Sequence, residues 1–291
     1  MSVVSKIVAE SDLGVTISSG IGYTAAKHFA RKGATVYIGV RSEAKGKAAV
    51  EGLEAEGIGS GKVIYHECEL GAPQQAKTAA LEFMKRVDRL DILGITRMMM
   101  VNYFGVFVLT NTLLPLLTRT AQKPNADVRI IAVSSNAHTV KPATNPNIRF
   151  NNLDEFKKAY DNAMFPFTFR YAMSKLALTL FSNALQRRVD PNIICISLHP
   201  GIVYTPIVRY DHDRIINLAL WLFGTTAEKG SYTTLFAAAS PKVKTEPEKY
   251  KGADLNPVGV LYDPNPHALR HDLQDELWTT TEQYLASIGL N

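Results

Sequence analysis

The sequence predicts an α/β fold: a doubly wound parallel sheet in a single domain over residues 1–291. Short β-branched runs alternate with amphipathic helical patterns from end to end, and no linker or internal repeat divides the chain. Near-continuous apolar runs are typical of strands that are buried on both faces of a parallel sheet. Right-handed crossovers then place helices on both sides of it. We expect a cofactor-binding half of about residues 1–135 and a catalytic and substrate half of about residues 136–291.

Five apolar runs are predicted as strands: Ala34–Val40, Lys62–His66, Leu90–Leu93, Val128–Ser134 and Asn192–Leu198. A strand near the N-terminus is weaker, because residues 10–12 are polar and interrupt it. Helical spacing predicts a first helix from Gly22 that Gly33 ends, and a second helix over Pro73–Val87. The one long irregular segment is 136–170, and a loop of that length inside a compact domain is usually functional.

Composition excludes several classes of protein. The net charge is +5, but the basic residues are scattered, which favours a solvated basic surface over a nucleic-acid face. Cys68 and Cys195 lie in apolar runs, as expected of buried thiols in a reducing compartment. The N-terminal stretch is interrupted by acidic residues, unlike a secretory signal, and Ile215–Phe223 is too short to span a membrane. We therefore expect a cytoplasmic protein without a membrane span, and the sequence leaves a homo-oligomer open.

A glycine pair opens the first predicted helix. Gly20 and Gly22, with Ile21 between them, would let the backbone approach a pyrophosphate at the positive end of the helix dipole. Arg41 is at the end of the next strand, where a dinucleotide-binding fold places the residue that contacts the adenosine ribose. A cation there binds the 2′-phosphate of NADP and so favours NADP over NAD. Lys45 could assist it. The alternative interpretation of Arg41 is a solvent-facing residue after a strand.

Tyr171 and Lys175 are spaced to lie on one face of a helix in the stretch RYAMSK. A neighbouring ammonium favours the phenolate form of a tyrosine, which makes the phenol a candidate general acid or base for a carbonyl/alcohol pair. The same spacing also occurs in ordinary surface contacts.

These residues occur together with VNYFG (Val101–Gly105), VSS (Val133–Ser135) and HPGIVYT (His199–Thr205), in the order used by the short-chain dehydrogenase/reductase (SDR) family. The chain resembles that family over nearly its whole length. Further features are similar to the retinol-dehydrogenase-like branch of this family: the long segment after Ser135, and the stretches SSNAH, TAEKG (Thr226–Gly230) and DELW (Asp275–Trp278). The resemblance implies a Rossmann-like fold and an NAD(P)-dependent oxidoreductase.

The resemblance also implies roles for single residues. Tyr171 would exchange a proton with the substrate oxygen, and Lys175 would hold the nicotinamide ribose and lower the pKa of the tyrosine. Ser135, rather than Ser134 on the opposite side of the strand, would hydrogen-bond the substrate oxygen. Asn102 would support a relay water. The residues expected to contact the cofactor are Ser19, Gly20, Ile21, Gly22, Arg41, Glu69, Tyr171, Lys175, Val203 and Thr205.

Two departures from the family pattern concern the cofactor side. The Thr-Gly of the first motif is replaced by Val15-Thr16, or Thr16 keeps its place and the glycine is lost. Only eight residues, 94–101, separate Leu93 from Asn102, so the Asn-Asn-Ala-Gly turn is absent. These departures support a second hypothesis, a non-catalytic relative that keeps the fold as a binding or interaction module. Retention of the serine, tyrosine and lysine favours the enzyme.

The remaining features concern ligands. The apolar segment 206–223 occupies the position of the family's substrate-covering helix and indicates a small lipophilic substrate of terpenoid, steroid, retinoid or polyketide type; ordinary core packing is the alternative. His267 and His271 have a spacing that can chelate a metal, but no third ligand is placed by the sequence, so we expect no metal site. The leading hypothesis is an NADP(H)-dependent oxidoreductase that interconverts an alcohol and a carbonyl.

Overall fold

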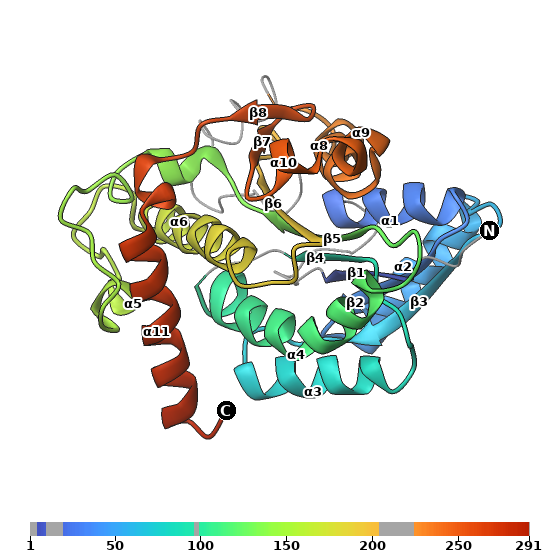
Figure 1. Ribbon diagram of the computed structural model, residues 1–291, viewed down its shortest axis with the longest axis horizontal. Coiled ribbons are helices and arrows are strands. Elements are labelled where there is room, and N and C mark those ends of the chain that lie inside the picture. Colours follow the sequence, from blue (N-terminus) through green and yellow to red (C-terminus); the bar gives the residue numbers. More distant parts are fainter. Residues whose placement is uncertain (1–4, 10–19, 96–98, 204–223, 291) are drawn as a thin grey trace.

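The computed structural model describes residues 5–9, 20–95, 99–203 and 224–290, and these form one sheet covered by helices on both faces (Figure 1). The strand order is β3-β2-β1-β4-β5-β6-β7-β8. The strands are β1 Ser5–Ala9, β2 Thr35–Val40, β3 Lys62–Glu67, β4 Ile92–Ile95, β5 Val128–Val133, β6 Ile193–Leu198, β7 Asp254–Asn256 and β8 Val260–Tyr262. All neighbours pair in parallel except β8, which is antiparallel to β7. The predicted doubly wound parallel sheet is confirmed.

The long helices are α1 Ile21–Arg31, α2 Glu43–Ala55, α3 Pro73–Met84, α4 Gly105–Ala121, α6 Pro166–Gln186, α8 Ala227–Ala239 and α11 His271–Ser287. The short ones are η1 Met99–Phe104 (a π-helical turn), η2 Asn136–Thr139, α5 Asp154–Lys157, α9 Pro241–Thr245, α10 Pro247–Tyr250 and η4 Pro266–Leu269. The segment 136–170, expected to be irregular, therefore contains η2, α5 and the start of α6.

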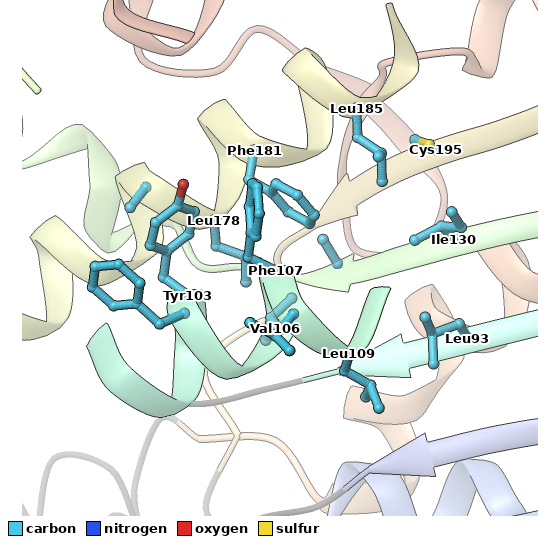
Figure 2. Close-up of a cluster of buried hydrophobic side chains, with 14 of the residues drawn as sticks. Leu93, Tyr103, Val106, Phe107, Leu109, Ile130, Leu178, Phe181, Leu185 and Cys195 are labelled. Atoms are coloured by element: carbon cyan, nitrogen blue, oxygen red, sulfur yellow. The ribbon is translucent and has the colours of Figure 1, made fainter. Parts of the chain in front are cut away.

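Two apolar clusters lie on the two faces of the sheet. Consecutive strand residues point to opposite faces, so Ile130 of β5 joins one cluster and Ile131 the other. On the first face α4 and α6 pack against β5 and β6, and α3 packs against α4 and β3. Figure 2 shows Phe107 of α4 and Phe181 of α6 meeting between these two helices. On the second face the cluster includes residues of α1, α2 and α8. This double coverage explains why the strands read as continuous apolar runs.

The C-terminal helix α11 packs against α6 on the side away from β1 and β2 (Figure 1). Asp275 accepts hydrogen bonds from Arg187 at 2.7 Å and from Arg188 at 2.5 Å, both at the end of α6. The ring of Trp278 stacks on that of Phe181, with centroids 5.8 Å apart. The DELW stretch therefore attaches the C-terminus to the helix that carries Tyr171.

The observed elements differ from the predicted ones mainly at their ends. The strand predicted at Leu90–Leu93 is found at Ile92–Ile95, and Asp91 before it is bonded to Arg89, whose nitrogens lie 2.6 and 2.8 Å from Oδ1. The weak first strand exists and ends at Ala9, directly before the polar residues. Both cysteines are buried free thiols, as expected.

One described helical stretch, Asn102–Ala121, is long and apolar enough to cross a membrane by length and composition alone. Its most apolar window is 67% buried inside the protein. A core helix has these properties as well, and α4 is a core helix, with Leu113, Leu116 and Leu117 fully buried in the first cluster.

Candidate active site

The candidate site lies where β5 ends and α6 passes over it. Lys175 of α6 is buried, and its Nζ donates a hydrogen bond of 2.8 Å to the carbonyl oxygen of Val133, the last residue of β5. The same Nζ lies 5.5 Å from the centre of the Tyr171 ring. The ring of Tyr171 is only half-buried. The two residues predicted from their spacing therefore lie on one face of α6, with the cation inside and the phenol toward the surface.

Burial governs the charge of Lys175. Loss of hydration lowers the pKa of its ammonium to about 7. One hydrogen bond to the Val133 carbonyl partly compensates that loss. A lysine with a pKa near neutrality changes its charge at working pH, directly beside the phenol that it is expected to influence.

The two serines after β5 have different surroundings. Ser134 is buried, and its Oγ lies 2.8 Å from Thr179 Oγ1 and donates to the carbonyl oxygen of Lys175 at 3.2 Å. Ser135 is half-buried and caps η2, where its Oγ accepts a hydrogen bond of 3.2 Å from the amide of Ala137. A hydroxyl that accepts in this way keeps its own hydrogen to donate. Ser134 fastens the strand end to α6, and Ser135 is the hydroxyl available to a ligand.

Asn102 lies in the π-helical turn η1 and is fully buried. Its Nδ2 donates to Ser174 Oγ at 2.8 Å, and that hydroxyl donates to the carbonyl oxygen of Tyr171, also at 2.8 Å. The Oδ1 of Asn102 has no partner among the described residues. The short connection after β4 therefore still delivers Asn102 to α6, one turn from Tyr171. The sequence reasoning missed Ser174, although it stands next to Lys175 in RYAMSK.

The start of α1 lies on the cofactor side. Gly20 precedes the helix with φ 154° and itself has no side chain to cap it, and the first turn has no acidic residue. Amide groups left in this way at a helix start attract an anion such as a pyrophosphate.

Gly230 of α8 brings together two residues predicted to contact the cofactor. A Cβ at this glycine would lie 2.4 Å from Val203 Cγ2 and 3.4 Å from Ile21 Cγ1. A hydrogen bond of 2.5 Å between His28 Nε2 and Glu228 Oε1 also joins α1 to α8. The glycine of TAEKG is therefore required by close packing beside the start of α1.

Arg41 and Glu69 follow β2 and β3, at the same edge of the sheet. Arg41 is exposed, and Glu69 is half-buried and accepts a hydrogen bond of 2.5 Å from the amide of Gly71. Ser19 and Thr205 lie outside the described residues, as do Val15-Thr16 and the apolar segment 206–223.

The described residues fit a nicotinamide dinucleotide. Open α/β sheets bind such ligands at the carboxyl ends of their parallel strands. Three groups lie at these ends or beside them: the helix start at Gly20, the buried amine of Lys175 and the exposed cation of Arg41. In the part of the chain that the structure describes, no three histidine, cysteine or acidic side chains are grouped to hold a metal ion.

Comparison with known proteins shows the family of the chain. A family model described as short chain dehydrogenase matches residues 15–147. A short-chain dehydrogenase/reductase of Armillaria gallica is 36% identical over 92% of this chain and 90% of its own. Human retinol dehydrogenase 14 is 29% identical over 91% of this chain and 83% of its own. The solved complex of Pseudomonas aeruginosa RhlG with NADP superposes with a TM-score of 0.63 at 20% identity, over 87% of this chain and 94% of that one.

The fold and these relatives together define an oxidoreductase that uses a nicotinamide cofactor. The chain belongs to the short-chain dehydrogenase/reductase family and, within it, is similar to the retinol dehydrogenases. It is an enzyme that interconverts alcohols and carbonyls with NAD(P). RhlG, at its low identity, supports the fold alone.

Proposed function

We propose that the protein is an NADP(H)-dependent oxidoreductase acting on a small lipophilic alcohol or carbonyl compound, with Tyr171 as its acid–base residue. The observation that carries this proposal is the pairing of a half-buried phenol with a buried amine, whose Nζ lies 5.5 Å from the phenol ring. Proton exchange with a substrate needs a group that solvent and ligand can reach, and Tyr171 meets that condition whereas Lys175 does not.

In the proposed reaction the nicotinamide cofactor, when bound, supplies or accepts the hydride. During reduction Tyr171 donates its phenolic proton to the substrate oxygen, and during oxidation it removes that proton. Lys175 in its charged form stabilises the phenolate that remains. The hydroxyl of Ser135 donates to the same oxygen as negative charge develops on it.

Asn102 has a supporting role in this proposal. Its buried amide is fixed by Ser174, and its Oδ1 has no partner among the described residues. Such an acceptor suits a relay water that returns a proton to the tyrosine side of the site.

The preference for NADP rests on charge. Arg41 is exposed directly after β2, and a guanidinium binds a phosphate through charge-assisted hydrogen bonds.

The lipophilic substrate is supported by exposed apolar side chains that shortly precede Tyr171 in the chain. Met164, Phe165 and Phe167 are 85%, 49% and 38% exposed, and we call them the apolar lip. The Phe167 ring is nearly parallel to that of Tyr171, at 5° with centroids 6.4 Å apart. Exposed large apolar side chains next to a polar site suit contact with an apolar ligand. The name of the human relative, retinol dehydrogenase 14, indicates an apolar alcohol as well.

The test is a titration of the purified protein with NADPH and, in parallel, NADH, followed by cofactor fluorescence. Saturable binding that prefers NADPH, followed by reduction of all-trans-retinal or decanal, is the expected result. A folded protein that binds neither cofactor would overturn the proposal and would favour the non-catalytic hypothesis.

A further inference from the structure

A buried hydrogen bond ties the turn that carries Ser135 to β7, which lies two strands from β5 in the sheet. His138 is the third residue after Ser135 and is 1% exposed. Its Nε2 lies 3.2 Å from Oδ2 of Asp254, a buried residue that begins β7. The two residues are separated by 116 positions in sequence, so the contact joins two distant parts of the fold.

The Asp254 carboxylate needs this partner. A buried carboxylate is costly unless it is hydrogen-bonded or paired. Among the described residues His138 on η2 hydrogen-bonds this carboxylate, and His199 after β6 lies within range of the charges of Asp254, His138 and Lys175. Burial lowers the pKa of His199, and its Nδ1 has no partner in the same part of the chain. The imidazole that hydrogen-bonds the Asp254 carboxylate is therefore that of His138.

The backbone of the same turn is held from a second direction. Asn265, also buried, donates through Nδ2 to the carbonyl oxygen of His138 at 2.6 Å and to that of Ala143 at 2.9 Å. Since η2 is a single turn of four residues, fixing His138 by both its side chain and its carbonyl also fixes the cap at Ser135.

The opposite side of Ser135 is equally constrained, because Ser134 is bonded to Thr179 and to the Lys175 carbonyl on α6. Ser135 therefore stands between a neighbour fixed to α6 and a turn fixed to β7. Donors that act on a developing oxyanion are effective when they are held in place before the reaction.

We propose that His138 and Asp254 form a positioning pair that holds η2 so that the Ser135 hydroxyl points at the substrate oxygen. The inference rests on the proposed function, in which Ser135 is the residue that donates to this oxygen. His138 and Asp254 act through Ser135 and have no contact with substrate.

The test compares two substitutions of His138. His138→Leu removes the donor at similar volume, whereas His138→Gln keeps an N–H donor at nearly the same reach. We expect His138→Leu to lower kcat about 10- to 100-fold with little change in the Kd for NADPH, and His138→Gln to retain most of the activity. In a Ser135→Ala background, His138→Leu should cause little further loss, because both changes remove the same interaction. Losses that multiply, or a kcat unchanged by His138→Leu, would overturn the positioning role.

A second readout does not depend on turnover. The amide of Ala137 donates to Ser135 Oγ, so its hydrogen exchange reports the turn directly. We expect exchange at Ala137 to be at least about tenfold faster in His138→Leu than in the wild type and in His138→Gln. If the wild type has no activity, the proposed function fails, and this exchange still decides whether the pair holds the turn. If the leucine variant does not fold, Asp254→Ala against Asp254→Asn gives the same comparison, and equal exchange and equal kcat in the two would contradict the proposal.

Discussion

The two ends of the candidate site are held in different ways. At the catalytic end, Lys175 and Asn102 are buried, and hydrogen bonds from α6 reach the end of β5 and the π-helical turn η1. At the adenosine end, Arg41 is exposed and Glu69 bonds an amide only two residues away. One end is thus fixed by contacts between distant segments, and the other is built on loops next to their own strands.

This difference separates two properties that a dehydrogenase needs. Chemistry requires groups whose geometry is set before the ligands arrive, which calls for burial and for long-range hydrogen bonds. Cofactor choice requires only a charge of the right sign on the surface, which can change with little effect on folding. Substitutions of Tyr171 and of the buried residues at the catalytic end should therefore change turnover or stability, and those at the adenosine end should change affinity alone.

The largest effect is expected for Tyr171→Phe. Removing the phenolic hydroxyl eliminates the acid–base group but leaves the ring, so kcat should fall by roughly 10³-fold while the Kd for NADPH stays within about twofold. Activity with retinal or decanal and a fluorescence titration measure the two quantities. Retained turnover would refute the assignment of Tyr171, and lost cofactor binding would show that the two ends are coupled.

Lys175→Met should show how much the burial of the Lys175 amine lowers the stability of the folded protein. The pKa of this lysine is about 7 in the folded protein, against an ordinary value of 10.5 for a hydrated lysine. The unfolded chain therefore binds the lysine proton more tightly than the folded protein does. Burial of Lys175 lowers the free energy of unfolding by an amount that grows as pH falls from about 10.5 to about 7 and stays constant below that. The methionine variant, without cofactor, should therefore be more stable than the wild type at pH 7 by on the order of 1–4 kcal/mol, although it is inactive.

The sign of that effect is checked by thermal unfolding of both proteins between pH 6 and pH 10. The gain in Tm should be largest at and below about pH 7 and should shrink toward pH 10. Lys62→Met, at an exposed lysine, is the matched control and should give no gain. A gain that is the same at every pH would mean that packing, not charge burial, explains the stabilisation.

Arg41→Ala tests the adenosine end. Loss of a charge-assisted contact should raise the Kd for NADPH roughly 10- to 100-fold and leave the Kd for NADH nearly unchanged. Because Arg41 is exposed, its contacts are screened by solvent and Tm should change little. Arg86→Ala, at another exposed arginine, serves as control. Equal losses for both cofactors would contradict the role of Arg41 in reading the 2′-phosphate.

The sequence predicted the fold and the pairing at the catalytic end, because both depend on local patterns. Apolar runs identify buried parallel strands, and a spacing of four on a helix brings Lys175 against the ring of Tyr171. It also separated Ser135 from Ser134 by strand alternation together with the family pattern. The structure gives a physical reason for that distinction, the bonding of Ser134 to α6.

The supporting residues could not be predicted in this way. Asp254 and Asn265 reach the turn of Ser135 from more than 110 positions away, and nothing in their local sequence indicates a partner. The sequence also did not show where the short connection after Leu93 would place Asn102. A π-helical turn and Ser174 place its amide on α6, and these follow from tertiary packing, not from a motif. The effect on cofactor affinity of the glycine missing near Thr16 stays a prediction.

The smallest effect is expected at the apolar lip, the part of the catalytic end that lies at the surface. Phe167 stacks beside Tyr171 and is partly exposed, so Phe167→Ala should remove apolar contact with the substrate without disturbing the buried network. The loss of one aromatic contact corresponds to about a 3- to 10-fold increase in KM for decanal.

Aldehydes of different chain length show whether the increase in KM comes from lost apolar contact with the substrate. A short aldehyde such as butanal does not extend as far along the lip, so its KM should hardly change, and Phe167→Leu should retain most of the affinity for decanal because it keeps apolar area. A loss of equal size for both aldehydes, mainly in kcat, would show instead that the ring of Phe167 orients Tyr171. In that case the surface part of the catalytic end would be as strictly positioned as its buried part, and the contrast between the two ends would be sharper still.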